Sequence, residues 1–152
     1  MASAVDDVRQ AEIERQALED INRTLDRMDK LQRRWMRELS RGDLEQAQGR
    51  KCVLGITGLK YHTFEKFFQV TPTGVEIVEP YEGFNSYIEA PLDSVVRVLK
   101  GVLEGDTTVF TQEWARGIAK IRGQRRVHDG YVFNQVFARL AEMFARYKRQ
   151  TV

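Results

Sequence analysis

The sequence predicts one small α+β domain preceded by a long helix. Residues 6–41 contain neither Pro nor Gly, and residues 50–90 alternate short apolar runs with Pro and Gly turns. Two amphipathic helical patterns separated by another strand-like run complete the chain. We therefore expect a five-stranded, mostly antiparallel sheet covered by helices, with the long helix over residues 1–42 and the α+β domain over residues 43–152.

The long helix has a narrow apolar seam. Strong helix formers run to Gly42, a residue that commonly ends helices. The seam has a 3-4-3-4 spacing with one polar member, Gln32, and this spacing is typical of coiled coils. It predicts a helix for self-association or for binding a partner protein, and the alternative is that the helix docks on its own domain. The apolar members are Leu18, Ile21, Leu25, Met28, Trp35 and Leu39.

Four strands are expected before the second helical region. Residues 52–57 form a short apolar run between glycines, and residues 61–71 carry aromatic side chains on both faces. The turn at residues 71–74 contains Pro72 and Gly74, so residues 75–79 are expected to return as the partner strand of a hairpin. Residues 84–90 supply the fourth strand, and we expect antiparallel pairing.

Helices and a fifth strand are expected in the rest of the chain. Pro91 precedes a helix whose apolar residues keep i, i+3, i+4 spacing up to Gly105. Residues 107–114 are expected to form a short helix, and residues 117–122 a strand that ends at Gly123. The last helix, over about residues 130–148, has a wide apolar stripe that should face the core or a cavity.

From about residue 50 to residue 147, the chain resembles the sterol carrier protein family. The resemblance lies in the hairpin around Pro72-Thr73-Gly74, in the segment Tyr87 to Gly101, and in Gly117 to Gly123 before a terminal helix. It implies a five-stranded sheet covered by helices, with an apolar tunnel that takes up a fatty acyl chain, a sterol or a similar lipid without reaction. The chain departs from the family after Gly123, and its first helix is more charged and more heptad-like.

Aromatic side chains are numerous enough to line an apolar ligand cavity. Such a cavity is the expected binding site, although the alternative for any one of these residues is that it simply fills the core. The candidate lining residues are Phe64, Phe68, Phe84, Tyr87, Phe110, Trp114, Phe133, Phe137 and Phe144.

Catalytic and metal sites are not expected. His62 and His128 have no companions at metal-ligand spacing, and Cys52 lies inside an apolar run, where it should be buried. We find no nucleophile triad, phosphate-binding loop or dinucleotide motif. The sequence therefore predicts no catalytic residue, no metal and no cofactor.

Composition narrows the choice of partners and location. The chain of 152 residues has 42% hydrophobic and 30% charged residues, which is typical of folded globular domains. A formal net charge of +2 makes nucleic acid an unlikely partner. The basic residues Arg116, Lys120, Arg122, Arg125 and Arg126 are expected to be solvated, and their alternatives are contacts with an acidic protein or peripheral contact with a membrane.

One free cysteine, a start without a signal peptide and the lack of a long apolar run predict a cytoplasmic location. The resemblance to the sterol carrier protein family, with the many aromatic residues and the lack of a catalytic motif, implies non-enzymatic binding or carriage of an apolar ligand between the sheet and the helices. The alternative is a structural subunit of an assembly with a filled core, which uses the long helix and a basic face for protein contacts.

Overall fold

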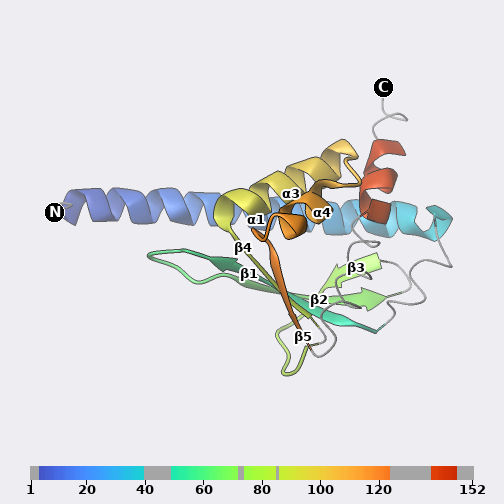
Figure 1. The fold of residues 1–152 in the computed structure, drawn as a ribbon, viewed down its shortest axis with the longest axis horizontal. Coiled ribbons are helices and arrows are strands. Elements are labelled where there is room, and N and C mark those ends of the chain that lie inside the picture. Colours follow the sequence, from blue (N-terminus) through green and yellow to red (C-terminus); the bar gives the residue numbers. More distant parts are fainter. Residues whose placement is uncertain (1–3, 40–48, 72–73, 85, 124–137, 147–152) are drawn as a thin grey trace.

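The chain folds into a twisted sheet with helices packed on one face (Figure 1). The structure is a computed structural model that describes residues 4–39, 49–71, 74–84, 86–123 and 138–146, and only the backbone at residues 33–39, 74 and 123. This arrangement is the α+β fold that the sequence predicts.

Helix α1 spans Ala4–Leu39, close to the predicted bounds. Its N-terminal turns project beyond the sheet in Figure 1, and three apolar side chains there are exposed: Val5, Val8 and Ile13. The following turns lie across the sheet. There Leu18, Ile21, Leu25 and Met28 are only 3–8% exposed and belong to the core of their own chain. In this structure the helix therefore docks on its own domain along the predicted seam.

The sheet has the strand order β3-β2-β1-β4-β5. Its strands are β1 (Lys51–Thr57), β2 (Glu65–Thr71), β3 (Gly74–Ile77), β4 (Ser86–Pro91) and β5 (Lys120–Gly123). Three of the four pairings are antiparallel, as expected, but β4 pairs with β1 in parallel. The expectation of antiparallel pairing was wrong here, because β3 ends level with the start of β1. The chain then crosses to the free edge of β1, where β4 begins beside Cys52 and runs in the same direction as β1.

Strand β2 begins at Glu65, four residues later than predicted. Gly58 adopts the left-handed conformation with φ 76°, and the segment after it turns towards α1. The backbone N–H groups of Lys60, Tyr61 and His62 donate to the carboxylate of Glu14 and not to a neighbouring strand. This loop between β1 and β2 is therefore built to contact the helix.

Helix α3 spans Leu92–Glu104 and α4 spans Val109–Ala115, as the patterns predict. Gly105 ends α3 in the left-handed conformation, with φ 86°. A Cβ atom at Gly101 would lie 2.8 Å from side-chain atoms of Val109, so the glycine permits close packing of α3 and α4. Within the predicted last helix, residues 138–146 are helical.

The main core lies between the helices and one face of the sheet. Side chains of α1 and α3, Phe110 of α4 and the segment 140–144 meet the alternate residues of the strands that point towards them. Cys52 is buried here as a free thiol, in agreement with the prediction. This layer between α1 and the sheet contains the cavity described next.

Candidate ligand cavity

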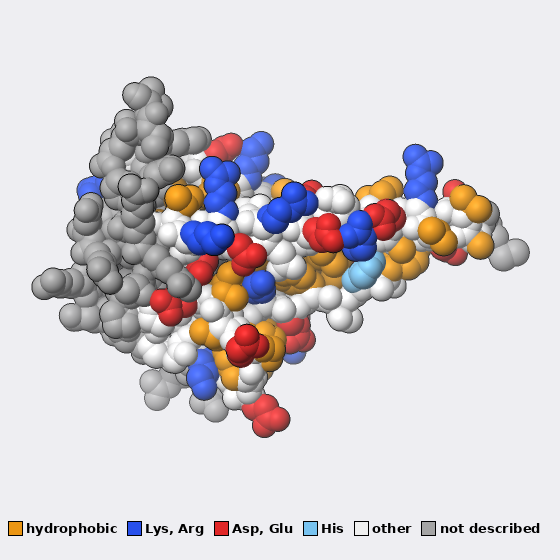
Figure 2. Space-filling view, turned by 180° about the vertical axis from the view of Figure 1, so that it is seen from behind, with side chains coloured by type: hydrophobic (Ala, Val, Ile, Leu, Met, Phe, Trp, Pro, Cys, Tyr) orange, Lys and Arg blue, Asp and Glu red, His pale blue; other side chains and the backbone are white. Residues whose placement is uncertain are grey.

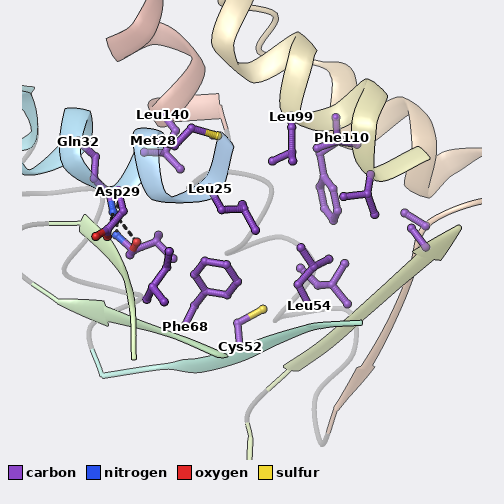
Figure 3. Close-up of a pocket in the computed structure, with 17 residues that line it drawn as sticks. Leu25, Met28, Asp29, Gln32, Cys52, Leu54, Phe68, Leu99, Phe110 and Leu140 are labelled. Atoms are coloured by element: carbon purple, nitrogen blue, oxygen red, sulfur yellow. Dashed lines mark hydrogen bonds between the residues drawn. The ribbon is translucent and has the colours of Figure 1, made fainter. Parts of the chain in front are cut away.

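An apolar cavity of about 100 Å³ lies beneath α1, between the helices and the sheet (Figure 3). Side chains from the sheet, α1, α3, α4 and the C-terminal helical segment all contribute to its wall. The lining residues are Leu25, Met28, Asp29, Gln32, Cys52, Leu54, Phe68, Val75, Ile77, Ile88, Ala90, Val95, Val98, Leu99, Phe110, Ala119 and Leu140.

The floor of the cavity is one face of the sheet. Ile77, Phe68 and Cys52 are paired in register across three neighbouring strands and all line the cavity. Residues two apart on a strand share a face, so Leu54 on β1 and Ile88 on β4 extend the same floor. Strand alternation thus gathers small and branched apolar side chains under the helix.

The roof comes from α1 and α3. In Figure 3, Leu25 points from α1 towards Phe68 and Cys52, Met28 lies beside Leu140, and Leu99 and Phe110 close the side formed by α3 and α4. Leu25 and Met28 are members of the heptad seam. The same 3-4 spacing that predicts a coiled coil here presents apolar side chains to the sheet.

Two polar residues of the lining, Asp29 and Gln32, are hydrogen-bonded to each other, and Gln32 is also hydrogen-bonded to the sheet edge. Gln32 Nε2 donates to Asp29 Oδ1 at 3.0 Å and to the backbone oxygen of Val75, and Gln32 Oε1 accepts the N–H of Val75 at 3.0 Å. The amide of Gln32 thus satisfies both backbone groups of Val75 on the edge strand β3. The Gln32 amide in the cavity wall is therefore already hydrogen-bonded within the protein.

The volume of the cavity limits the size of the ligand that fits in it. An engineered apolar cavity of about 150 Å³ stays dry and binds benzene, whereas pockets for drug-sized ligands usually measure about 300–1,000 Å³. At about 100 Å³ this cavity is smaller than either, so it has room for a short hydrocarbon segment, and a ring fits only if the surrounding side chains shift. A longer chain requires the roof to move.

The predicted cavity aromatics fall into separate groups. Phe68 and Phe110 line the cavity. Phe64 and Phe144 are buried elsewhere in the core, and Trp114 packs against it. Phe133 and Phe137 lie outside the described residues.

The remaining two predicted aromatics, Phe84 and Tyr87, lie apart from the cavity. Tyr87 alternates with the cavity residue Ile88, which directs it to the opposite face of the sheet, where it contacts Phe84 with ring centroids 5.5 Å apart. Phe84 is 44% exposed. Arg122, predicted to be a solvated basic residue, lies over the Tyr87 ring at 4.5 Å and pairs with Glu89 at 3.4 Å.

The contribution of α1 to the cavity was missed, although its signal was present. The seam predicts association with a partner or docking on the domain itself, but neither interpretation counts Leu25, Met28 and Gln32 as cavity residues. Trp35 and Leu39, the last two residues of the predicted seam, lie where only the helix backbone is described. Association through the seam stays a prediction.

A polar contact fastens the N-terminal half of α1. The Glu14 carboxylate accepts N–H groups from Lys60 (3.0 Å), Tyr61 (3.0 Å) and His62 (2.8 Å), and it lies 3.0 Å from His62 Nδ1. Burial alone would raise the pKa of Glu14, but the hydrogen bonds from these residues lower it below its usual value. We call this contact the Glu14 latch.

A surface groove of about 620 Å³ lies between α1 and α3, on the other side of the seam from the sheet. Apolar side chains such as Leu31 and Leu103 form part of it, but charged side chains also line it: Asp20, Arg27, Lys100 and Glu104. On the side seen in Figure 2, acidic and basic side chains are interspersed over the visible part of the molecule. The cavity beneath α1 is the more apolar of the two hollows.

The described part of the chain contains no group of three or more His, Cys, Asp or Glu side chains that could hold a metal ion. Glu113 is nearly buried on α4, with its carboxylate 2.5 Å from Arg97 Nε. Such a pair ties α4 to α3. No described helix has the length and apolar character needed to cross a membrane.

Comparisons with protein-family models and with curated proteins find no match. Several solved structures are similar at low identity. A sterol carrier protein 2 crystal structure is 15% identical, with a TM-score of 0.46 over 77% of this chain and 95% of that chain. The apo form of sterol carrier protein 2 from Yarrowia lipolytica is 10% identical, with a TM-score of 0.45 over 86% and 88% of the two chains.

A structure described as a UbiJ-SCP2 ubiquinone synthesis protein is 15% identical, with a TM-score of 0.44 over 66% of this chain and 74% of that one. The resemblance of this chain to sterol-carrier-protein-like structures is therefore diffuse.

Proposed function

We propose that this chain binds an apolar ligand of the lipid class, without reaction, in the cavity beneath α1. The observation that carries the proposal is an apolar hollow between the helices and the sheet, with most of its wall formed by aliphatic and aromatic side chains. Binding there is favoured because the ligand leaves water, which lowers the free energy by about 25 cal/mol for each Å² of apolar surface buried.

A lipid longer than the closed cavity enters, in this proposal, by displacement of α1. The helix forms one side of the hollow through Leu25 and Met28, and polar contacts at Gln32 and Glu14 help to hold it. These polar contacts are local and can break without unravelling the sheet. The proposed carrier is thus a sheet with a movable helical roof.

Native mass spectrometry of the purified protein, before and after denaturation and organic extraction, tests the proposal. We expect a stoichiometric lipid-sized mass that extraction removes. Ala90→Leu places a larger side chain in the cavity floor and should abolish retention. Val53→Leu is the matched control, because Val53 alternates with Cys52 and Leu54 and therefore faces the opposite side of the sheet.

Both variants must first show cooperative thermal unfolding, so that loss of ligand is not confused with loss of fold. A folded protein that carries no extractable mass and takes up no added lipid would contradict the proposal. That result would favour the alternative of a structural subunit with a filled core. Equal retention by Ala90→Leu and wild type would place the ligand somewhere other than this cavity.

A further inference from the structure

A buried hydroxyl beside the cavity has no partner. Ser86 is 0% exposed, and its Oγ has no hydrogen-bond partner among the residues that the structure describes. Leaving such a group unpaired costs about 1–3 kcal/mol, so buried hydroxyls are nearly always bonded to protein, water or a ligand. Ser86 therefore calls for a partner that the chain itself does not supply within the described part.

Ser86 points to the same side of the sheet as the cavity. On β4 it alternates with Tyr87 and shares a face with Ile88 and Ala90, both of which line the cavity. In the sheet it is the register partner of Cys52, another cavity residue. Ser86 is not itself one of the lining residues, but neighbouring strands lie about 4.8 Å apart, so its side chain lies one strand beyond Cys52, next to the end of the cavity floor.

One row of side chains crosses the strands of the cavity floor, and no side chain follows Ser86 at the next strand. We call it the floor row. Ile77, Phe68, Cys52 and Ser86 follow one another across the sheet, and the register partner of Ser86 on β5 is Gly123, which has no side chain. The row thus changes from apolar to polar in one step at β4. A ligand lying along the row would place its hydrocarbon part on Phe68 and its polar end at Ser86.

The charges of the other lining residues determine whether a neutral or an anionic ligand group is favoured beside Ser86. Among the described residues of the lining there is no lysine, arginine or histidine, and Asp29 carries the one carboxyl group. A carboxylate in an apolar site without a cation loses its hydration with no compensation, and Asp29 would repel it. A neutral hydroxyl or carbonyl needs only one hydrogen bond there.

We propose that the Ser86 hydroxyl hydrogen-bonds the polar group of a neutral ligand, an alcohol, phenol, ketone or ester, and that the cavity rejects free carboxylic acid anions. This inference rests on the proposed function and narrows its ligand class. It separates neutral lipids from fatty acid anions, both of which fit an apolar hollow of unspecified chemistry.

Three probes of similar size test it: phenol, toluene and benzoate, each titrated into the labelled full chain and followed by NMR. Ser86→Ala should weaken phenol binding about five- to tenfold, the loss of one hydrogen bond, and leave toluene within about twofold. Benzoate should bind wild type at least about a hundredfold more weakly than phenol. Ser86→Cys keeps only a weak donor and should give an intermediate phenol affinity.

Ser94→Ala is the matched control. Ser94 is also 0% exposed with an unpartnered Oγ, but it lies on α3 and not in the floor row. Its substitution should leave the ratio of phenol to toluene affinity unchanged. Ser86→Ala removes an unpaired hydroxyl and should keep the fold, as an unchanged pattern of amide resonances away from β4 would show.

The possible failures are distinguishable. Toluene and phenol binding with no change of phenol affinity in Ser86→Ala would overturn the role of Ser86 while leaving the proposed function intact. Benzoate binding as tight as phenol would overturn the charge selection. Absence of binding by all three probes to wild type would contradict both the inference and the cavity as a binding site.

Discussion

At the scale of single residues, Gln32 shows how a polar side chain can belong to an apolar seam. It is 3% exposed, and its amide meets the N–H and the carbonyl oxygen of Val75. These groups belong to β3, an edge of the sheet, and unpaired edges invite pairing with other chains. Gln32 therefore joins the helix to the sheet and covers part of an edge.

Replacing Gln32 with Met should destabilise the protein by about 1–3 kcal/mol, because the N–H and the carbonyl oxygen of the partly buried Val75 lose their partners while volume is nearly conserved. Urea unfolding monitored by circular dichroism measures the change. Gln16→Met, on the exposed side of the same helix, is the control and should change stability by less than about 0.5 kcal/mol. Equal effects of the two substitutions would contradict the role of Gln32.

Tyr81 gives a prediction at high pH. Its hydroxyl donates to the backbone oxygen of Phe68 at 2.8 Å and lies 3.1 Å from that of Cys52, and burial raises the pKa of Tyr81 from 10.0 to about 12. The folded state thus favours the neutral phenol. Its contribution to stability is complete below pH 10 and is lost as the pH rises through about 12.

Tyr81→Phe should therefore be less stable than wild type at pH 8, and the difference should shrink as the pH approaches 12. Urea unfolding at a series of pH values checks this, and the other tyrosines affect both proteins alike. A difference in stability that stays constant from pH 8 to pH 12 would show that Tyr81 does not titrate with a raised pKa.

At the scale of elements, the sequence predicted the helices and strands well, because each has a local signal. Pro91 and Gly105 mark the ends of α3, and period-two alternation marks β4. The start of β2 was wrong because Glu14, far away in sequence, takes the backbone donors of the loop. No local pattern at residues 60–62 reveals a partner on another element.

The Glu14 latch should open in acid. Since hydrogen bonds hold the pKa of Glu14 below its usual value of 4.5, the latch stabilises the docked state above that pH and is lost as the pH falls below it. Amide hydrogen exchange at Lys60, Tyr61 and His62 measures the latch directly. Protection factors should fall between pH 6 and pH 3.5 in wild type.

Glu14→Gln should show lower protection at pH 6 and little dependence on pH, because the amide cannot ionise. Glu19→Gln is the control, since Glu19 is exposed on α1 and pairs with Arg15. Its loop amides should behave like those of wild type. Identical protection in Glu14→Gln and wild type at pH 6 would contradict the latch.

At the scale of the whole molecule, the fold class could be predicted but the assembly of its layers could not. The parallel pairing of β1 with β4 depends on which side of β1 the β2–β3 hairpin takes. The seam of α1 has the same spacing whether it meets a helix or a sheet, because both partners need one apolar stripe. Of the seven predicted cavity aromatics among the described residues, Phe68 and Phe110 line the cavity, and aliphatic residues of several elements contribute to the rest of the wall.

The position of the seam leads to a prediction about stability and concentration. Leu18, Ile21, Leu25 and Met28 are buried in their own chain, so unfolding should not require dissociation. The thermal midpoint of wild type should then be independent of protein concentration over about a hundredfold range, whereas a helix paired between chains would give a midpoint that rises with concentration. Differential scanning fluorimetry at low and high concentration measures this, with sedimentation velocity for the mass.

The variant Leu25→Asp further distinguishes a seam buried within one chain from a seam paired between chains. A charge at this buried position has no cation beside it among the described lining residues, and it should destabilise the chain by more than about 3 kcal/mol at every concentration. If the seam instead served association, the same variant would remain a folded monomer of lower mass, and its thermal midpoint would no longer rise with protein concentration. That outcome would support α1 as an association helix and would contradict the proposal that it covers the cavity.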